Sequence, residues 1–92
     1  LSPPRESRGL RARAVLLDPG ETMPWHSTGA REELLVALAG RLRLEWHVRV
    51  RGTRKRSLSA GQCAFLQARV EHRVVNPSTH RAHYGYVTGS AR

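Results

Sequence analysis

Apolar and polar residues alternate most regularly between Arg41 and Arg51. Every second position carries Leu, Trp or Val, and the positions between them carry Arg, Glu or His. Successive side chains of a strand lie on opposite faces, whereas a helix would spread these apolar residues around its circumference. The pattern predicts a strand over 41–51 with one buried and one solvated face. Trp46 belongs to the buried face, as core filler or as the wall of a pocket.

Shorter apolar runs flank this segment, and turn-forming residues separate them. Residues 63–66, 70–75 and 81–88 are predicted as strands, whereas residues 52–56 and 57–61 are predicted as turns. The run 10–17 suits a strand or a helical turn, and the run 34–39 suits a strand or a helix. Turn signals at intervals of about 8–12 residues are typical of a β-sandwich or β-barrel, so the expected class is all-β.

The length of 92 residues allows one domain. Residues 1–9 are polar, contain two prolines and are predicted to form a loose arm before a single domain over 10–92. No apolar run reaches the roughly 18 residues of a membrane span, and the N-terminus has no apolar signal core, so we expect a cytoplasmic protein. Cys63 has no second cysteine to pair with, and its apolar surroundings predict a buried structural thiol.

The net charge of +9 does not by itself indicate a nucleic-acid partner. All but one of the 16 basic residues are arginine, and they are scattered along the chain. The densest cluster, over 49–56, contains no aromatic residue on which a base could stack. We interpret it as a solvated hairpin tip and do not expect nucleic acid to bind.

Three residues combine into a possible metal site. If the extended segments around His26, Glu33 and His72 point these side chains into one interior, two imidazoles and a carboxylate meet on apolar walls. A buried carboxylate must be paired or bound to a metal, and two His with one carboxylate is a ligand set of non-haem iron, zinc or nickel. A lone histidine is more often solvated or hydrogen-bonded, so parity alone leaves that alternative open.

The spacing of several residues resembles the two motifs of the cupin family. Gly20, His26, Thr28, Glu33 and Gly40 match the first motif, G-x5-H-x-H-x3,4-E-x6-G. After a spacer of 20 residues, the second motif, G-x5-P-x-G-x2-H-x3-N, is matched at Gly61, His72 and Asn76.

This resemblance implies a small single-domain cupin, that is, a double-stranded jelly-roll β-barrel. It also implies that His26, Glu33 and His72 bind one divalent transition metal: iron, nickel, copper or zinc. We expect His26 and Glu33 on neighbouring strands, with His72 across the barrel.

The sequence departs from the cupin pattern at three positions. Thr28 replaces the second histidine of the first motif, which reduces the usual ligands to two His and one Glu. Gln67 and Arg69 replace the proline and glycine of the second motif. Arg69 would be strained if its φ angle were positive.

Two classes of function remain open. The first is a metal-dependent enzyme, an oxygenase, isomerase or lyase, acting on a small polar molecule. The second is a non-catalytic module that binds a small ligand or a metal for sensing or storage. Candidate substrate-binding residues in either case are Thr28, Trp46, Tyr84 and Tyr86.

The run that contains Glu33 also predicts an apolar outer surface. If Glu33 points inward, Leu34, Val36 and Leu38 point outward and need covering by the second sheet, the N-terminal arm or a partner. We expect a homodimer, because a thin barrel leaves sheet edges open.

Overall fold

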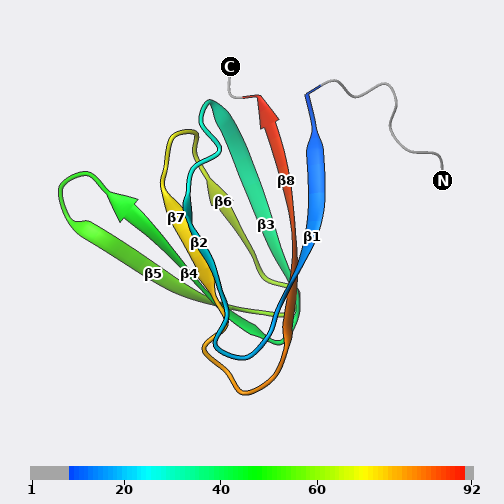
Figure 1. The fold of residues 1–92 in the computed structure, drawn as a ribbon. Helices are drawn as coiled ribbons and strands as arrows, with labels where there is room; N and C mark the ends of the chain where they lie inside the picture. The colour runs from blue at the N-terminus through cyan, green and yellow to red at the C-terminus, as the bar shows by residue number, and fades with distance from the viewer. Residues whose placement is uncertain (1–8, 91–92) are drawn as a thin grey trace.

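Eight strands and no helix make up residues 9–90, the part of the chain that the computed structural model describes (Figure 1). The strands are β1 (Arg11–Leu17), β2 (Thr22–His26), β3 (Arg31–Ala39), β4 (Arg41–Val48), β5 (Gly52–Ser59), β6 (Cys63–Leu66), β7 (His72–Val75) and β8 (Ala82–Ser90). Of the predicted arm over residues 1–9, only Gly9 lies within the described residues. No helix among the described residues is long and apolar enough to cross a membrane.

The strands form two four-stranded antiparallel sheets that face each other. The first sheet has the order β1-β8-β3-β6 and the second has the order β2-β7-β4-β5 (Figure 1). Neighbouring strands of one sheet are therefore distant in sequence, as in a jelly roll. The predicted all-β jelly roll is confirmed, with its two sheets packed as a sandwich.

The core lies between the sheets and follows the alternation of each strand. Leu35 and Ala37 of β3 are fully buried, as are Leu42 of β4 and Ala82 of β8. Adjacent β3 positions such as Leu34 and Leu38 are exposed on the opposite face. Burial on every second residue resolves the ambiguity of the run 34–39 in favour of a strand.

The prediction of turns over 52–56 and 57–61 was wrong for most of these residues. β4 ends at Val48, Val50 lies in the following turn with 91% of its surface exposed, and β5 occupies 52–59. β5 pairs with β4 along its whole length, from Val48 opposite Gly52 to Arg41 opposite Ser59. Backbone pairing alone holds this polar strand, which is why no apolar pattern marks it in the sequence.

The prediction of a buried Cys63 was also wrong. Cys63 is exposed, whereas Ala64 and Leu66 of the same strand are buried. In a four-residue strand of a two-layer fold, the period of two turns half of an apolar run towards solvent. Cys63 and Phe65 belong to that half.

The outer surface of the first sheet is apolar. We call it the outer apolar face; it comprises Ala12, Ala14, Leu16, Leu34, Val36, Leu38, Phe65 and Val87. Leu34 and Leu38 are 42% and 49% exposed there, so the second sheet, which packs on the opposite side, does not cover them. The first of the three predicted coverings is thereby excluded.

Two backbone positions account for a match to and a departure from the cupin motifs. Gly40 has a φ of +78°, and a Cβ there would lie 2.8 Å from the carbonyl oxygen of Arg81. Arg69 also adopts a positive φ, +66°, at the position where the second motif carries glycine. The strain expected for Arg69 is therefore present, since left-handed backbone disfavours a side chain.

Candidate metal centre

The structure brings His26, Glu33 and His72 together at one end of the sandwich. Each offers one ligand atom, and these atoms lie within 4.8 Å of one another. His26 ends β2 and is the cross-strand partner of His72 on β7, with ring centroids 4.4 Å apart. Glu33 faces them from β3 in the other sheet. The expectation that His26 and Glu33 lie on neighbouring strands was wrong, because the two histidines share a sheet and Glu33 lies across the interior.

Backbone carbonyl groups orient both imidazole rings. His26 Nδ1 lies 2.7 Å from the carbonyl oxygen of Pro24, and His72 Nδ1 lies 3.1 Å from that of Val70. A carbonyl oxygen only accepts hydrogen bonds, so each Nδ1 carries the proton. In the neutral rings each Nε2 then keeps its lone pair, which is the arrangement of metal-binding histidines.

Glu33 and His72 present two unsatisfied atoms to each other. Glu33 Oε1 and His72 Nε2 lie 3.5 Å apart, and neither has a hydrogen-bond partner among the described residues. Both side chains are almost completely buried, at 3% and 1% exposure. Two facing acceptors in an apolar interior require a positive charge between them, which can be a proton or a metal ion.

The cluster changes the acidity of two of its groups. Burial opposes the imidazolium form of His72, but the Glu33 carboxylate and the Val70 carbonyl outweigh this effect and raise its pKa. Burial is also the main reason why the pKa of Tyr84 is raised, and the negative charge of Glu33 adds to it. Tyr84 therefore keeps its phenolic proton at neutral pH and can act as a hydrogen-bond donor.

A cavity of about 330 Å³ opens onto the triad. Besides the three triad residues, its lining comprises Arg13, Met23, Pro24, Val74, Tyr84 and Tyr86. Two of the four predicted substrate-binding residues, Tyr84 and Tyr86, thus lie beside the triad. A cavity of this volume is at the lower end of the range for small-molecule sites.

The other two predicted substrate-binding residues lie outside this cavity. Thr28 donates a hydrogen bond of 2.6 Å to the carbonyl oxygen of Arg31 and borders a neighbouring cavity. Trp46 is paired with His72 across β4 and β7 but packs against the core on the side towards β5.

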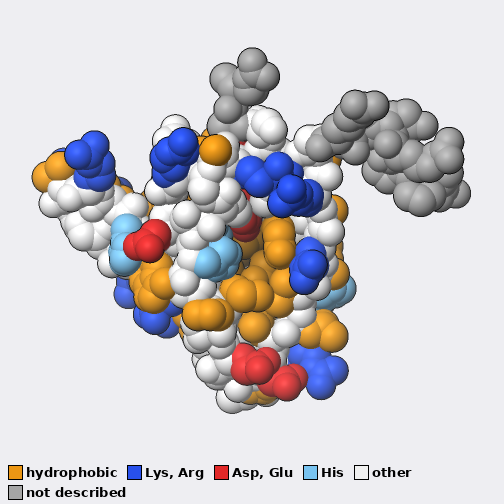
Figure 2. Space-filling model, turned by 45° about the horizontal axis from the view of Figure 1, so that its top comes forward, with side chains coloured by type: hydrophobic (Ala, Val, Ile, Leu, Met, Phe, Trp, Pro, Cys, Tyr) orange, Lys and Arg blue, Asp and Glu red, His pale blue; other side chains and the backbone are white. Residues whose placement is uncertain are grey.

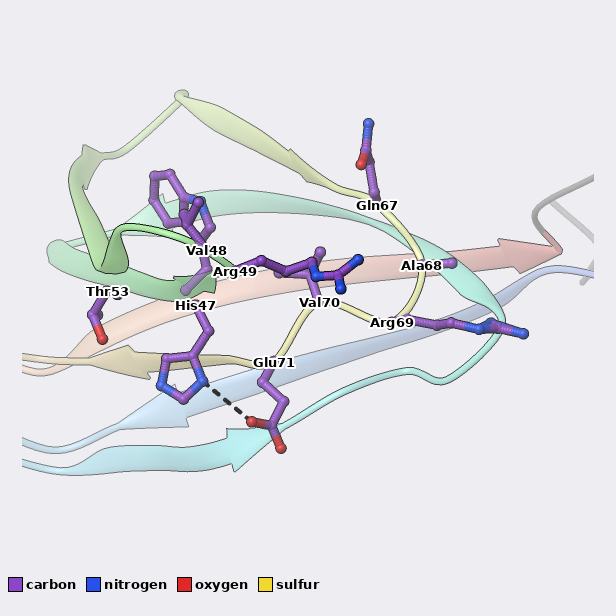
Figure 3. Close-up of a pocket in the computed structure, with 11 residues that line it drawn as sticks. His47, Val48, Arg49, Thr53, Gln67, Ala68, Arg69, Val70 and Glu71 are labelled. Carbon is purple, nitrogen blue, oxygen red and sulfur yellow. Dashed lines mark hydrogen bonds and ion pairs between the residues drawn. The ribbon is translucent and has the colours of Figure 1, made fainter.

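The largest cavity, about 1000 Å³, lies away from the triad. It is bordered by the β4–β5 hairpin and the loop before β7, where His47 Nδ1 pairs with Glu71 Oε1 at 3.2 Å (Figure 3). His47 also stacks on Trp25. Its open shape and the absence of converging polar groups make it a less suitable site than the smaller cavity, in which buried unpaired atoms meet.

Two charged residues near the core escaped the sequence analysis. Arg13 of β1 lines the triad cavity, a position that the alternation of Arg and Ala over 11–14 could have indicated. Glu45 is buried on the outer side of the second sheet, where Arg43 and Arg73 bind its two carboxylate oxygens at 2.6 and 2.7 Å. No local pattern reveals Glu45, because Arg73 comes from a distant strand.

Comparison with known families agrees with the fold and the spacing of the triad. The cupin domain family matches residues 13–88, which is most of the chain. The chain belongs to the cupin family. No curated protein matches it.

Solved cupin structures share its fold at low sequence identity. An oxalate oxidase superposes with a TM-score of 0.83 at 20% identity, over 89% of this chain and 42% of the oxidase. A protein from Thermus thermophilus gives 0.79 at 24%, over 91% and 75%. The cupin domain of Schizosaccharomyces pombe Cnp3 gives 0.81 at 10%, over 95% and 60%. The first structures, Peruvianin-I (a cysteine peptidase from Thevetia peruviana latex) and oxalate oxidase, are about twice as long as the matched region.

Proposed function

We propose that this cupin domain binds one divalent transition metal through His26 Nε2, His72 Nε2 and a carboxylate oxygen of Glu33. The observation that supports this most directly is the buried pair of unpartnered atoms, Glu33 Oε1 and His72 Nε2. A metal ion between them would satisfy both atoms at once. The hydrogen bonds at both Nδ1 atoms support the same proposal, because they leave the Nε2 lone pairs available.

The donor set indicates which metals suit the site. Two imidazoles and one carboxylate favour iron, nickel, copper or zinc over calcium, which prefers oxygen ligands. Three protein ligands leave coordination positions for water or substrate. Such a metal would supply Lewis acidity, or a site for oxygen, to a molecule in the cavity.

The surrounding side chains support an enzyme acting on a small polar molecule as an oxygenase, isomerase or lyase. Met23 and Val74 provide apolar walls that limit water, and Tyr84 offers a proton close to Glu33. Oxalate oxidase, a cupin whose structure was also determined with the substrate analogue glycolate, shows that this fold can carry such an activity. At 20% identity this likeness concerns the fold alone.

One observation favours the alternative, a module that holds a metal or small ligand without turnover. Apart from the triad, the polar side chains that line the cavity are Arg13, Tyr84 and Tyr86. None of them is a ready general base at neutral pH, because both phenols and the guanidinium are protonated.

Metal analysis of the purified protein and of histidine variants tests the proposal. We expect one transition metal per chain, and its loss in His72→Ala and His26→Ala. The matched control is His80→Ala, which removes an exposed imidazole away from the triad. Equal metal content in His72→Ala and in the control would refute the site.

The partner that we propose for the outer apolar face is a second copy of the chain. The chain carries a net charge of +9, yet the eight residues of this face are uncharged. Two copies can therefore meet there without bringing their arginines together. We also propose a cytoplasmic location, since the exposed free thiol of Cys63 suits a reducing compartment.

A further inference from the structure

Arg13 connects the triad cavity with a second, basic cavity. The second cavity, about 520 Å³, is bordered by Arg11, Arg13 and Arg31 and by the hydroxyl-bearing residues Ser27, Thr28, Tyr86 and Thr88. Arg13 and Tyr86 line both cavities, so the two adjoin. Figure 2 looks onto this end of the molecule, where basic side chains border a hollow of apolar side chains beside a histidine.

The orientation of β1 is the reverse of that in an ordinary amphipathic strand. Arg11 and Arg13 share the face of Val15 and Leu17 that is directed towards the second sheet, whereas Ala12 and Ala14 lie on the outside. A register shifted by one residue would exchange these faces and place both arginines in open solvent. The chain instead places two positive charges at the cavity mouth.

The three arginines differ in how their donors are used. Arg31 donates to Thr88 Oγ1 at 2.9 Å and to the carbonyl oxygen of Gly9 at 2.6 Å, and so it fastens β3 to its neighbours. Arg11 and Arg13 make no hydrogen bond or ion pair with any described residue. Their guanidinium groups are therefore available to an incoming ligand.

We infer that the ligand of this cavity carries a carboxylate or phosphate group, which Arg13 binds with Arg11 beside it. Three guanidinium groups and one carboxylate, Glu33, border the joined cavities, so the local charge favours an anion. The planar guanidinium matches both oxyanions through paired hydrogen bonds. This inference deepens the proposed function: Arg13 would hold the anionic end of a small molecule whose remainder reaches the triad.

Titration with succinate and with inorganic phosphate, followed by nuclear magnetic resonance, tests this inference on the full chain. We expect succinate or phosphate to shift resonances of β1 and β8 and to bind about tenfold more weakly to Arg13→Gln. Arg13→Lys should recover part of the loss, because the charge returns without the paired geometry. The matched control is Arg54→Gln, since Arg54 is an exposed arginine of β5 outside both cavities.

The two arms and the metal content separate the outcomes. Tighter binding of succinate than of phosphate assigns a carboxylate ligand, and the reverse assigns a phosphate. Equal affinities of Arg13→Gln and Arg54→Gln for both anions would overturn the inference, even if the protein contains its metal. Anion binding that depends on Arg13 in a protein without metal would support the anion site and contradict the proposed function. Arg11→Gln provides a second test at the same mouth if Arg13→Gln does not fold.

Discussion

Glu33 Oε1 and His72 Nε2 lie 3.5 Å apart, directed at each other from opposite sheets of the sandwich. The carboxylate belongs to β3 and the imidazole to β7, so the pair forms only when the two sheets pack face to face. Because neither atom has a hydrogen-bond partner among the described residues, the pair leaves room for a cation. The folding of the sandwich and the assembly of the candidate metal centre are therefore the same event.

Metal should stabilise the native protein and have no such effect on a triad variant. A ligand that binds only the folded state adds about 2.7 kcal/mol at 100 times its Kd, which raises Tm by several degrees. We expect this increase when zinc is added to the metal-free protein and expect its loss in Glu33→Gln, whose amide is a poor ligand. Differential scanning calorimetry provides the measurement. Glu71→Gln, which neutralises an exposed carboxylate, is the control and should retain the increase.

Glu45 should make stability depend on acidity. Burial opposes its ionised form, but hydrogen bonds and charge from Arg43 and Arg73 more than compensate and lower the pKa of the carboxyl group. A lowered pKa in the folded state gives stability that is present above the ordinary Glu value and is lost as the pH falls through the folded value.

Urea denaturation at several pH values below about 4.5 measures this effect. We expect Glu45→Gln to be less stable at neutral pH by about 1 kcal/mol or less, because both arginines are partly exposed, and expect the difference to shrink in acid. A difference that stays constant with pH would contradict the assignment.

Arg69→Gly should stabilise the protein. A side chain at φ +66° costs about 1–2 kcal/mol, and glycine returns about 0.5–1 kcal/mol of this through the greater freedom of the unfolded chain. The expected gain is up to about 1 kcal/mol in the free energy of unfolding. Arg54→Gly, within β5, should have the opposite sign, and a loss of stability in both variants would contradict the prediction.

Two glycines with the same backbone conformation should differ in their response to alanine. Gly20 and Gly40 have φ angles of +79° and +78°, but a Cβ at Gly20 meets nothing within 4 Å, whereas one at Gly40 lies 2.8 Å from Arg81 O. We expect Gly20→Ala to cost about 1 kcal/mol from strain and Gly40→Ala clearly more, because backbone must move. Equal costs in urea denaturation would show that the contact is relieved without penalty.

A charge on the outer apolar face should weaken self-association. Phe65 is 58% exposed on this face, and an arginine there would place like charges between two copies. Light scattering over a range of concentrations should show a dimer for the natural chain and a shift to monomer for Phe65→Arg. Val50→Arg, which adds the same charge at the distant hairpin turn, should leave the dimer intact. A natural chain that stays monomeric would exclude the second copy as the partner.

The sequence by itself determined the all-β class, the strand nature of 41–48 and the identity of the triad residues. These features follow from local properties: the period of two along a strand and the fixed spacing of Gly20, His26, Glu33, Gly40, Gly61 and His72. The tertiary structure decided what depends on pairing between distant segments. β5 is a strand because β4 offers it a ladder, and Cys63 is exposed because its strand has one outer face.

The geometry of the site likewise depended on the packing of the sheets. Sequence parity could direct His26 and Glu33 inward, but only the strand order reveals that His26 pairs with His72 while Glu33 lies opposite. The same packing brings Arg13 to the cavity and buries Glu45 between two arginines. A strand's alternation defines its two faces, and the topology of the two sheets defines which residues those faces meet.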